Sequence, residues 1–151
     1  MKPLWLVLLL LGVCACQPSP SPPLQLLPLP PYRYEFTDGA AQNRIDYFYI
    51  DPAPSDTAQL KQTLPAALLA KIPDNNKAYT LYSVYVYQKT AALDPQQTLQ
   101  PAVLRASHKQ ALISYSRWNN GRLTLSYLLE NGMVVYDLLT GQAVSPAWEF
   151  D

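Results

Sequence analysis

Residues 110–139 read QALISYSRWNNGRLTLSYLLENGMVVYDLL, three apolar segments separated by two Asn-Gly pairs. Asn and Gly tolerate the positive backbone torsions that a tight hairpin needs, and each pair is flanked by alternating apolar residues. This pattern predicts two consecutive β-hairpins and is the clearest structural signal in the chain. The predicted strands run from Gln110 to Trp118, Arg122 to Leu129 and Met133 to Leu139, joined by Asn119-Asn120-Gly121 and Glu130-Asn131-Gly132.

Two segments before these hairpins also have strand character. Arg44 to Ile50 is short, aromatic and β-branched, and the prolines at 52 and 54 cannot continue its ladder. Ala78 to Gln88 carries bulky side chains on both faces, which indicates a central strand. A last short strand is expected after residues 140–142, ending near Trp148.

Residues 55–71 change to a helical period. Ser55 or Asp56 can cap the start of this helix, and Pro73 closes its end. Pro65 lacks an amide hydrogen and crowds the previous turn, so we expect either a kink near Gln62 or a second short helix. The apolar positions at helical spacing are Leu60, Leu64, Ala67, Leu68 and Ile72.

A strand, a helix and then a series of hairpins together predict an α+β fold. We expect an antiparallel sheet of about five strands, with one kinked or split helix packed on a face. The length of residues 32–151 allows one hydrophobic core, so this segment is expected to form a single domain.

The composition excludes several classes of function. The 151 residues hold 11 basic and 11 acidic side chains, and no charge run is present, so neither nucleic-acid binding nor electrostatic adhesion to anionic lipid is indicated. Both cysteines, Cys14 and Cys16, lie near the N-terminus. The predicted domain therefore has no disulfide and no thiolate metal site.

The N-terminus has the composition of a cleavable export signal. Lys2 precedes an apolar run that ends at Val13-Cys14-Ala15-Cys16, too short to span a bilayer. This stretch resembles the signal peptide of bacterial lipoproteins over residues 1–16, although Cys14 departs from the Ala, Ser or Thr usual at its position. The open alternative is an ordinary secretory signal with incidental cysteines.

The lipoprotein resemblance implies a defined chemistry for Cys16. Its thiol would receive a diacylglycerol, the signal peptide would be cut after Ala15, and the new amine would be acylated, for example with palmitate. Two or three acyl chains hold a protein on a bilayer far more firmly than one. In a bacterium with two membranes, Gln17 in place of Asp implies transfer to the outer membrane, facing the periplasm or beyond.

Residues 18–31 have a different composition, because seven of these fourteen residues are proline. Proline favours extended backbone, so we expect a semi-rigid spacer of about 3.1 Å per residue, roughly 40 Å in all. Residues 16–31 are thus predicted to be a lipidated cysteine followed by a tether. The alternative is a docking site for a groove that binds Pro-x-x-Pro segments.

The chain offers few side chains for catalysis. His108 is the only histidine and has no neighbouring metal-ligating or nucleophilic partner in the sequence. Asp46 and Asp137 each interrupt an apolar strand, which indicates either a wet sheet face or a carboxylate pair in a cleft. No nucleophile elbow or phosphate-binding loop is present. We expect no enzyme activity, no cofactor and no metal.

Tyrosine is the most distinctive residue of the predicted domain, with eleven in the chain. By strand alternation Tyr79, Tyr85 and Tyr87 share one face, which is either core or a recognition surface. The recognition hypothesis predicts a non-catalytic envelope accessory module that binds a protein partner or a glycan. The alternatives are a tethered inhibitor or immunity protein against a toxin or wall-degrading enzyme, and a hydrolase of an envelope polymer.

Overall fold

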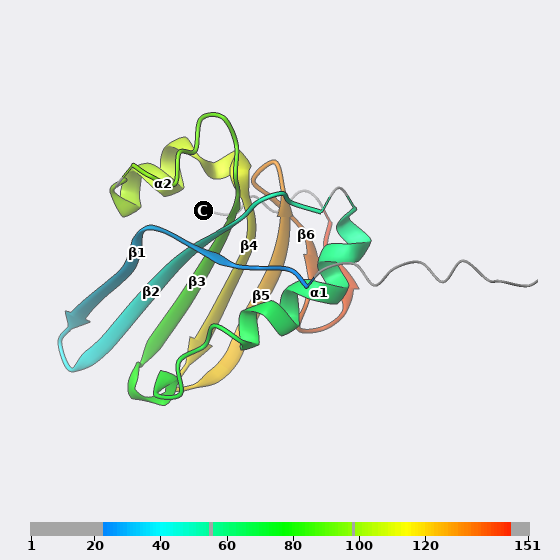
Figure 1. Cartoon of the computed structure of the whole chain (residues 1–151). Coiled ribbons are helices and arrows are strands. Elements are labelled where there is room, and N and C mark those ends of the chain that lie inside the picture. The colour runs from blue at the N-terminus through cyan, green and yellow to red at the C-terminus, as the bar shows by residue number, and fades with distance from the viewer. Residues whose placement is uncertain (1–22, 55, 98, 146–151) are drawn as a thin grey trace, which may run out of the picture.

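A seven-stranded sheet forms the centre of the structure, a computed structural model that describes residues 23–54, 56–97 and 99–145. Consecutive strands are neighbours throughout the sheet, and every pair is antiparallel except the parallel pair β2–β3 (Figure 1). The strands are β1 (Leu27–Asp38), β2 (Ala41–Ile50), β3 (Leu81–Gln88), β4 (Leu112–Asn119), β5 (Arg122–Glu130), β6 (Met133–Asp137) and β7 (Gln142–Ala143).

The two predicted hairpins are confirmed. Asn120 and Gly121 connect β4 to β5, and Asn131 and Gly132 connect β5 to β6. All four residues have positive φ, between 48° and 81°. Such torsions match the right-handed twist of the flanking strands, so local turn chemistry accounts for this half of the sheet.

The predicted fold class is wrong in its sheet. The chain is 46% strand and 22% helix, so it is sheet-dominated rather than an α+β fold with about five antiparallel strands. The sheet is mixed because the chain leaves β2, forms a helix and returns as β3 beside β2 in the same direction. A crossover of this kind is what a parallel pair requires.

The crossover helix α1 spans Thr57–Leu69 without being split at Pro65. The Asp56 side chain accepts a hydrogen bond of 2.8 Å from the Ala58 N–H, so this residue supplies the predicted cap. Ser55, the other predicted cap, lies outside the described residues. The buried side chains of α1 are Leu60, Leu64 and Leu68, which follow the predicted helical spacing.

Two elements were not predicted. Strand β1 begins at Leu27, and Leu26 and Leu29 are only 2% and 0% exposed, so the predicted tether does not extend to residue 31. The short helix α2 (Pro101–Ser107) buries Leu104. Short 3-10 turns also form at Asn76–Ala78 and Lys109–Ala111. Residues 1–22, which include Cys16 and most of the tether, lie outside the described residues.

The two helices lie on opposite sides of the sheet (Figure 1). We call the side packed against Leu60, Leu64 and Leu68 the α1 face, and the side packed against Leu104 the α2 face. Each side has its own hydrophobic cluster, and β3 contributes to both. The prediction that 78–88 contains a central strand is confirmed, because β3 is buried on both sides.

Candidate functional site

The three tyrosines predicted to form a binding face do not share one. Tyr85 and Tyr87 are 8% and 0% exposed and belong to the core of the α2 face. Tyr79 packs against the α1 face, with its ring 6.3 Å from that of Tyr82. The prediction failed because β3 begins at Leu81, so strand alternation does not extend back to residue 79. Tyr85 and Tyr87 therefore serve as core residues.

Four buried tyrosines form a ladder across the α2 face. Tyr47, Tyr85, Tyr115 and Tyr127 are paired in register on β2, β3, β4 and β5. The rings of Tyr47 and Tyr85 stack at 5.4 Å, and those of Tyr85 and Tyr115 lie 4.8 Å apart. Burial and the neighbouring Tyr115 raise the pKa of Tyr85 to about 12. Cross-strand aromatic pairs stabilise a sheet, so the ladder explains much of the tyrosine content.

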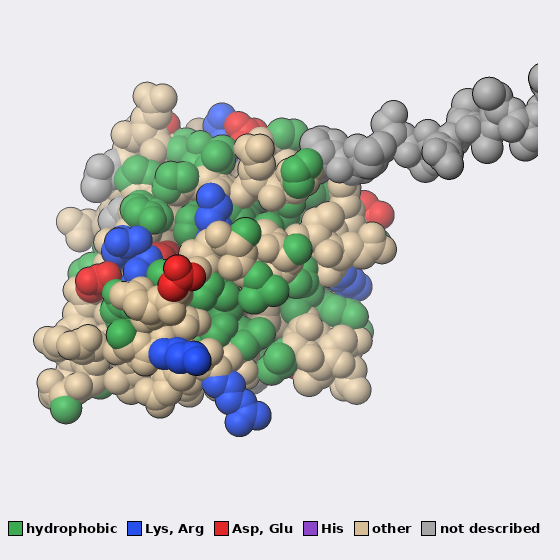
Figure 2. Space-filling model, turned by 60° about the horizontal axis from the view of Figure 1, so that its bottom comes forward, with side chains coloured by type: hydrophobic (Ala, Val, Ile, Leu, Met, Phe, Trp, Pro, Cys, Tyr) green, Lys and Arg blue, Asp and Glu red, His purple; other side chains and the backbone are tan. Residues whose placement is uncertain are grey.

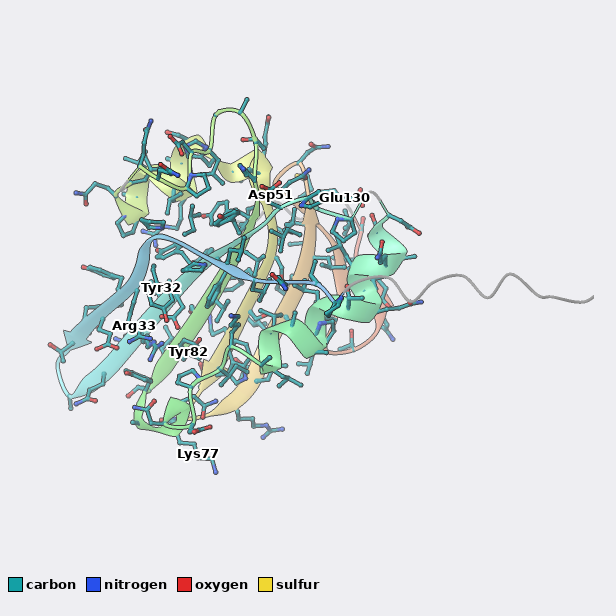
Figure 3. The ribbon with its side chains drawn as sticks, viewed as in Figure 1. Tyr32, Arg33, Asp51, Lys77, Tyr82 and Glu130 are labelled. Carbon is teal, nitrogen blue, oxygen red and sulfur yellow. The ribbon has the colours of Figure 1, made fainter. Side chains whose placement is uncertain are left out.

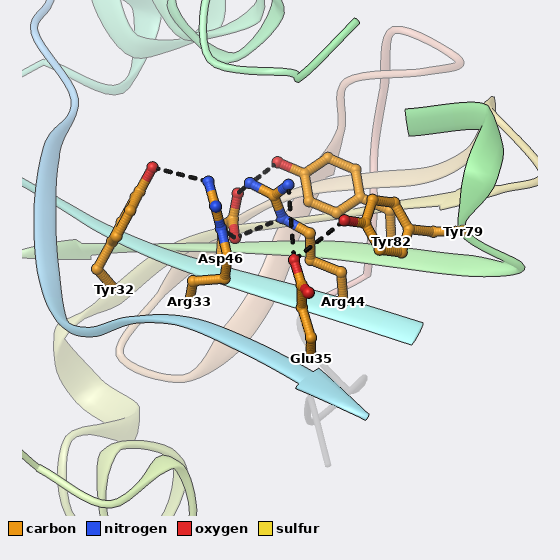
Figure 4. Close-up of polar contacts among 7 residues, drawn as sticks. All are labelled: Tyr32, Arg33, Glu35, Arg44, Asp46, Tyr79 and Tyr82. Carbon is orange, nitrogen blue, oxygen red and sulfur yellow. Dashed lines mark hydrogen bonds and ion pairs between the residues drawn. The ribbon is translucent and has the colours of Figure 1, made fainter. Parts of the chain in front are cut away.

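The α1 face carries a cluster of charged and aromatic side chains at the end of the sheet away from α1 (Figures 3 and 4). At its centre, Arg44 and Asp46 of β2 are 4% and 1% exposed. Arg44 donates two hydrogen bonds to Asp46, from Nε at 2.9 Å and from a terminal nitrogen at 2.6 Å. This ion-pair cluster comprises Tyr32, Arg33, Glu35, Arg44, Asp46, Tyr79 and Tyr82.

Tyr82 of β3 completes the bonding of the buried pair. Its hydroxyl donates to Asp46 Oδ2 at 3.0 Å, and its ring lies 5.4 Å from the Arg44 guanidinium. Burial and the Asp46 charge raise the pKa of Tyr82 above its ordinary value. Burial lowers the pKa of Arg44, but its bonds to Asp46 and Tyr79 outweigh this and raise it overall. Both groups keep their protons at any physiological pH.

The outer part of the ion-pair cluster comes from β1. Arg33 Nε lies 3.5 Å from Asp46 Oδ1, and Glu35 Oε1 lies 3.9 Å from an Arg44 nitrogen and accepts from the Tyr79 hydroxyl at 3.0 Å. Two arginines and two carboxylates balance, so the cluster is not built to hold a free anion. Figure 2 shows acidic and basic side chains gathered at this end of the face, beside a hydrophobic area.

The sequence carries a signal for this cluster in the spacing of its charges. Arg33 and Glu35 are two residues apart on one strand, as are Arg44 and Asp46 on the next. Residues two apart in a strand point to the same face. Two such pairs on consecutive strands of a hairpin, Arg33 opposite Asp46 and Glu35 opposite Arg44, place opposite charges across the ladder.

The carboxylates that prompted the hydrolase hypothesis do not converge. Asp46 lies on β2 and is held by Arg44, whereas Asp137 lies on β6 and accepts from the backbone N–H groups of Leu139 and Thr140. His108 follows the end of α2. Among the described residues there is no group of three side chains suited to hold a metal ion, and no bilayer-spanning helix is found in this part of the chain.

An apolar pocket of about 150 Å³ opens on the α1 face, beneath the C-terminal end of α1. Leu69 and Leu139 at this pocket are 67% and 49% exposed. Ser116 and Ser126 also line it, although they are 0% and 4% exposed. This α1 pocket is lined by Pro65, Leu68, Leu69, Ser116, Trp118, Leu123, Ser126, Leu138 and Leu139.

Ser116 and Ser126 are the polar side chains among the residues that line the α1 pocket. Their Oγ atoms lie 2.9 Å apart and share one hydrogen bond. The bond pairs the two buried hydroxyls with each other, because one donates and the other accepts. The pocket is thus mostly apolar, with one buried polar pair among its lining side chains, a composition common in binding sites.

A larger hollow, of about 330 Å³, lies between the segment 23–25 and the start of α1. It is lined in part by Asp51, Gln59 and Thr63, so it is more polar than the α1 pocket. It has no buried hydroxyl pair and lies where the N-terminal segment enters the described structure. We therefore take the α1 pocket as the candidate site.

The chain was compared with protein families, curated proteins and solved structures. No protein family, curated protein or solved structure matches the chain.

Proposed function

We propose that this chain is a bacterial lipoprotein, anchored by acylated Cys16 in the envelope and in the outer membrane where one exists. The support is the sequence Val13-Cys14-Ala15-Cys16 after a short apolar run. Cleavage after Ala15 leaves seven residues between Cys16 and Leu24, the first described side chain that packs against the hydrophobic cluster of the α1 face. A fully extended segment of seven residues spans roughly 20 Å at about 3.1 Å per residue, which limits how far from the bilayer the domain can lie.

The anchored domain is a non-catalytic module that binds a partner protein. The observation that carries this proposal is the α1 pocket, where the exposed leucines Leu69 and Leu139 lie beside the buried Ser116–Ser126 pair. An apolar cavity of about 150 Å³ holds a group the size of benzene. One aliphatic or aromatic side chain of a partner therefore fits the pocket.

The two exposed leucines leave apolar surface in contact with water beside the pocket. Covering such surface with a partner stabilises a complex by roughly 25 cal/mol per Å² of apolar area. A free small molecule would bury less of Leu69 and Leu139 than a protein surface does. Asp46, Asp137 and His108 do not come together, so no hydrolytic mechanism is proposed.

A photo-crosslinking amino acid at Leu139 tests the binding proposal in intact envelopes. We expect one discrete adduct with another protein, and no such adduct when the same amino acid replaces exposed Gln96. Leu69→Asp in the Leu139 crosslinking chain should lower the adduct yield about tenfold, because a carboxylate at the pocket is costly to bury.

Ala66→Asp is the matched control, since it places the same charge at an exposed position of α1 that does not line the pocket. Equal loss of the adduct in both variants, or the same adducts from Gln96, would reject the α1 pocket as the binding site.

The anchor is tested separately by mass spectrometry of the N-terminal peptide from native membranes. We expect a peptide that begins at residue 16 and carries two or three acyl chains. Cys16→Ser should abolish acylation and release the protein from membranes, whereas Cys14→Ser should leave both unchanged. An unmodified thiol at Cys16 in the wild-type chain would refute the lipoprotein proposal and leave the pocket proposal standing.

A further inference from the structure

The outer edge of β1 differs between its two halves. Strand β1 is the first strand of the sheet and pairs with β2 alone among the described residues (Figure 1). Its first half contains Pro28, Pro30 and Pro31, which lack the N–H groups that a further strand would need. Residues 32–38 contain no proline, so every residue of this half keeps the N–H group that pairing with a further strand requires.

The backbone of Arg33, Glu35 and Thr37 faces outward along this edge. The Gln42 carbonyl accepts from the Thr80 N–H at 2.8 Å, so the backbone groups of Gln42 point toward β3. Gln42 and its β1 partner Thr37 are therefore a non-hydrogen-bonded pair, in which the Thr37 backbone groups point away from β2. Backbone direction alternates along a strand, and Glu35 and Arg33 therefore point the same way as Thr37. These three alternate residues offer their N–H and C=O groups to another strand.

The side chains of this edge are self-complementary when the strand runs antiparallel to a copy of itself. With a two-fold axis at Tyr34, Arg33 lies opposite Glu35 of the other copy, and Glu35 lies opposite Arg33. Moving the axis by one residue places Arg33 opposite Arg33 or Glu35 opposite Glu35. Opposite charges across a strand pair stabilise it, and like charges destabilise it.

We propose that two copies of this chain pair through β1 about a two-fold axis at Tyr34, which joins their sheets into one. In this register the outward backbone groups of Arg33 and Glu35 bond to those of the second copy. Their side chains extend the ion-pair cluster across the axis on the α1 face. This inference goes beyond the proposed function and does not depend on the α1 pocket.

The opposite face of the edge supplies apolar contact for the same register. Tyr34 and Phe36 point away from Arg33 and Glu35, their rings lie 5.4 Å apart, and they are 46% and 37% exposed. At the axis the two copies of Tyr34 form a non-hydrogen-bonded pair, whose Cα atoms lie about 4.5 Å apart. The ring pairs of the two copies then meet in one aromatic row.

This geometry predicts a specific disulfide. The full chain with Tyr34→Cys, in native membranes and treated with mild oxidant, should form a covalent dimer on a non-reducing gel. Phe36→Cys is the matched control on the same face, because the two copies of residue 36 lie too far apart to bridge. We expect about tenfold more dimer from Tyr34→Cys, since Cα atoms more than 7 Å apart cannot be joined without backbone movement.

The wild-type chain, run alongside, accounts for any dimer formed through Cys14 or Cys16. In the Tyr34→Cys chain, Glu35→Pro removes an N–H that faces the second copy and leaves the hydrogen bonds between β1 and β2 in place. Glu35→Lys keeps the backbone and places like charges opposite each other. Both changes should reduce the dimer several-fold, and circular dichroism checks that the fold is retained.

Three results would overturn the pairing. They are no disulfide from Tyr34→Cys, equal dimer from Phe36→Cys, and a Tyr34→Cys adduct with a different protein in place of the dimer. The last result would assign the edge of β1 to a strand of another protein.

Discussion

The α1 face and the α2 face bury their polar groups in different ways, and β3 shows the difference within six residues. Tyr82 on the α1 face and Tyr87 on the α2 face are both 0% exposed. The Tyr82 hydroxyl donates to the buried carboxylate of Asp46, whereas the Tyr87 hydroxyl has no hydrogen-bond partner among the described residues. The α1 face is thus organised by an ion pair, and the α2 face by aromatic packing.

Removing Asp46 should produce the largest effect, because it leaves the Arg44 charge buried without its partner. We expect Asp46→Ala to lower the free energy of unfolding by about 3–5 kcal/mol, the usual result of breaking a buried ion pair. Urea denaturation of the wild-type and variant chains measures the difference.

Asp51→Asn is the control for this prediction. Asp51 forms an ion pair of 2.7 Å with Lys89, but both side chains are more than 40% exposed. Exposed pairs contribute little to stability, so we expect no measurable change. Similar losses from both variants would show that the burial of the Arg44–Asp46 pair does not matter.

Alkaline pH should act on the buried tyrosines of both faces, among them Tyr85 of the tyrosine ladder. The pKa of Tyr85 is raised from 10.0 to about 12, so the folded chain holds the phenol proton more tightly than the unfolded chain does. This contribution to the free energy of unfolding is fully present below pH 10 and is lost as the pH rises from 10 to 12. A shift of this size corresponds to about 3 kcal/mol. Urea denaturation between pH 8 and 12 should therefore show a fall in the free energy of unfolding.

Tyr85→Phe identifies the group responsible for part of this fall, because phenylalanine does not titrate. Burial also raises the pKa values of Tyr47, Tyr82, Tyr87 and Tyr127, so the fall should become smaller in the variant and not vanish. An unchanged pH dependence in Tyr85→Phe would contradict the assignment.

Tyr82→Phe sharpens the comparison on the α1 face. It removes one hydroxyl that donates to a carboxylate and keeps the ring. A hydrogen bond to a charged group contributes about 1.5–3 kcal/mol, so we expect a loss in that range. Thermal and urea unfolding of the variant provide the measurement, and a loss no greater than that of Tyr87→Phe would refute it.

Tyr87→Phe should have the smallest effect. Its hydroxyl is buried without a partner in the described part of the chain, so its removal relieves a desolvation cost and leaves the packing intact. We expect stability to be unchanged or to rise by about 1 kcal/mol, with the sign opposite to that of Tyr82→Phe. A clear loss of stability would reveal a bond to the Tyr87 hydroxyl.

Elements with strong local signals were predictable from the sequence. The Asn-Gly turns located β4, β5 and β6, and apolar spacing with Asp56 located α1. Helix α2 was not predicted, because seven residues are too few for a helical period to be detected and only one of them, Leu104, is buried. Strand β1 was missed because its prolines favour an extended spacer as much as an edge strand.

The candidate sites were less predictable than the elements. Tyr85 and Tyr87 were correctly placed on one side of their strand, but the sequence does not show that Leu104 and Leu29 cover that side. The α1 pocket is bounded by α1 and by strands far from it in the sequence. A pocket of this kind leaves no local motif.

The sequence by itself determined where the chain turns, where α1 begins and which segment crosses the sheet centre, because these depend on backbone torsions and capping within a few residues. Only the tertiary structure decided that β2 and β3 run parallel, that Tyr82 reaches Asp46 and that β1 pairs, among the described residues, with β2 alone. Pairing and burial depend on residues tens of positions apart. Their free energy arises only when those segments meet.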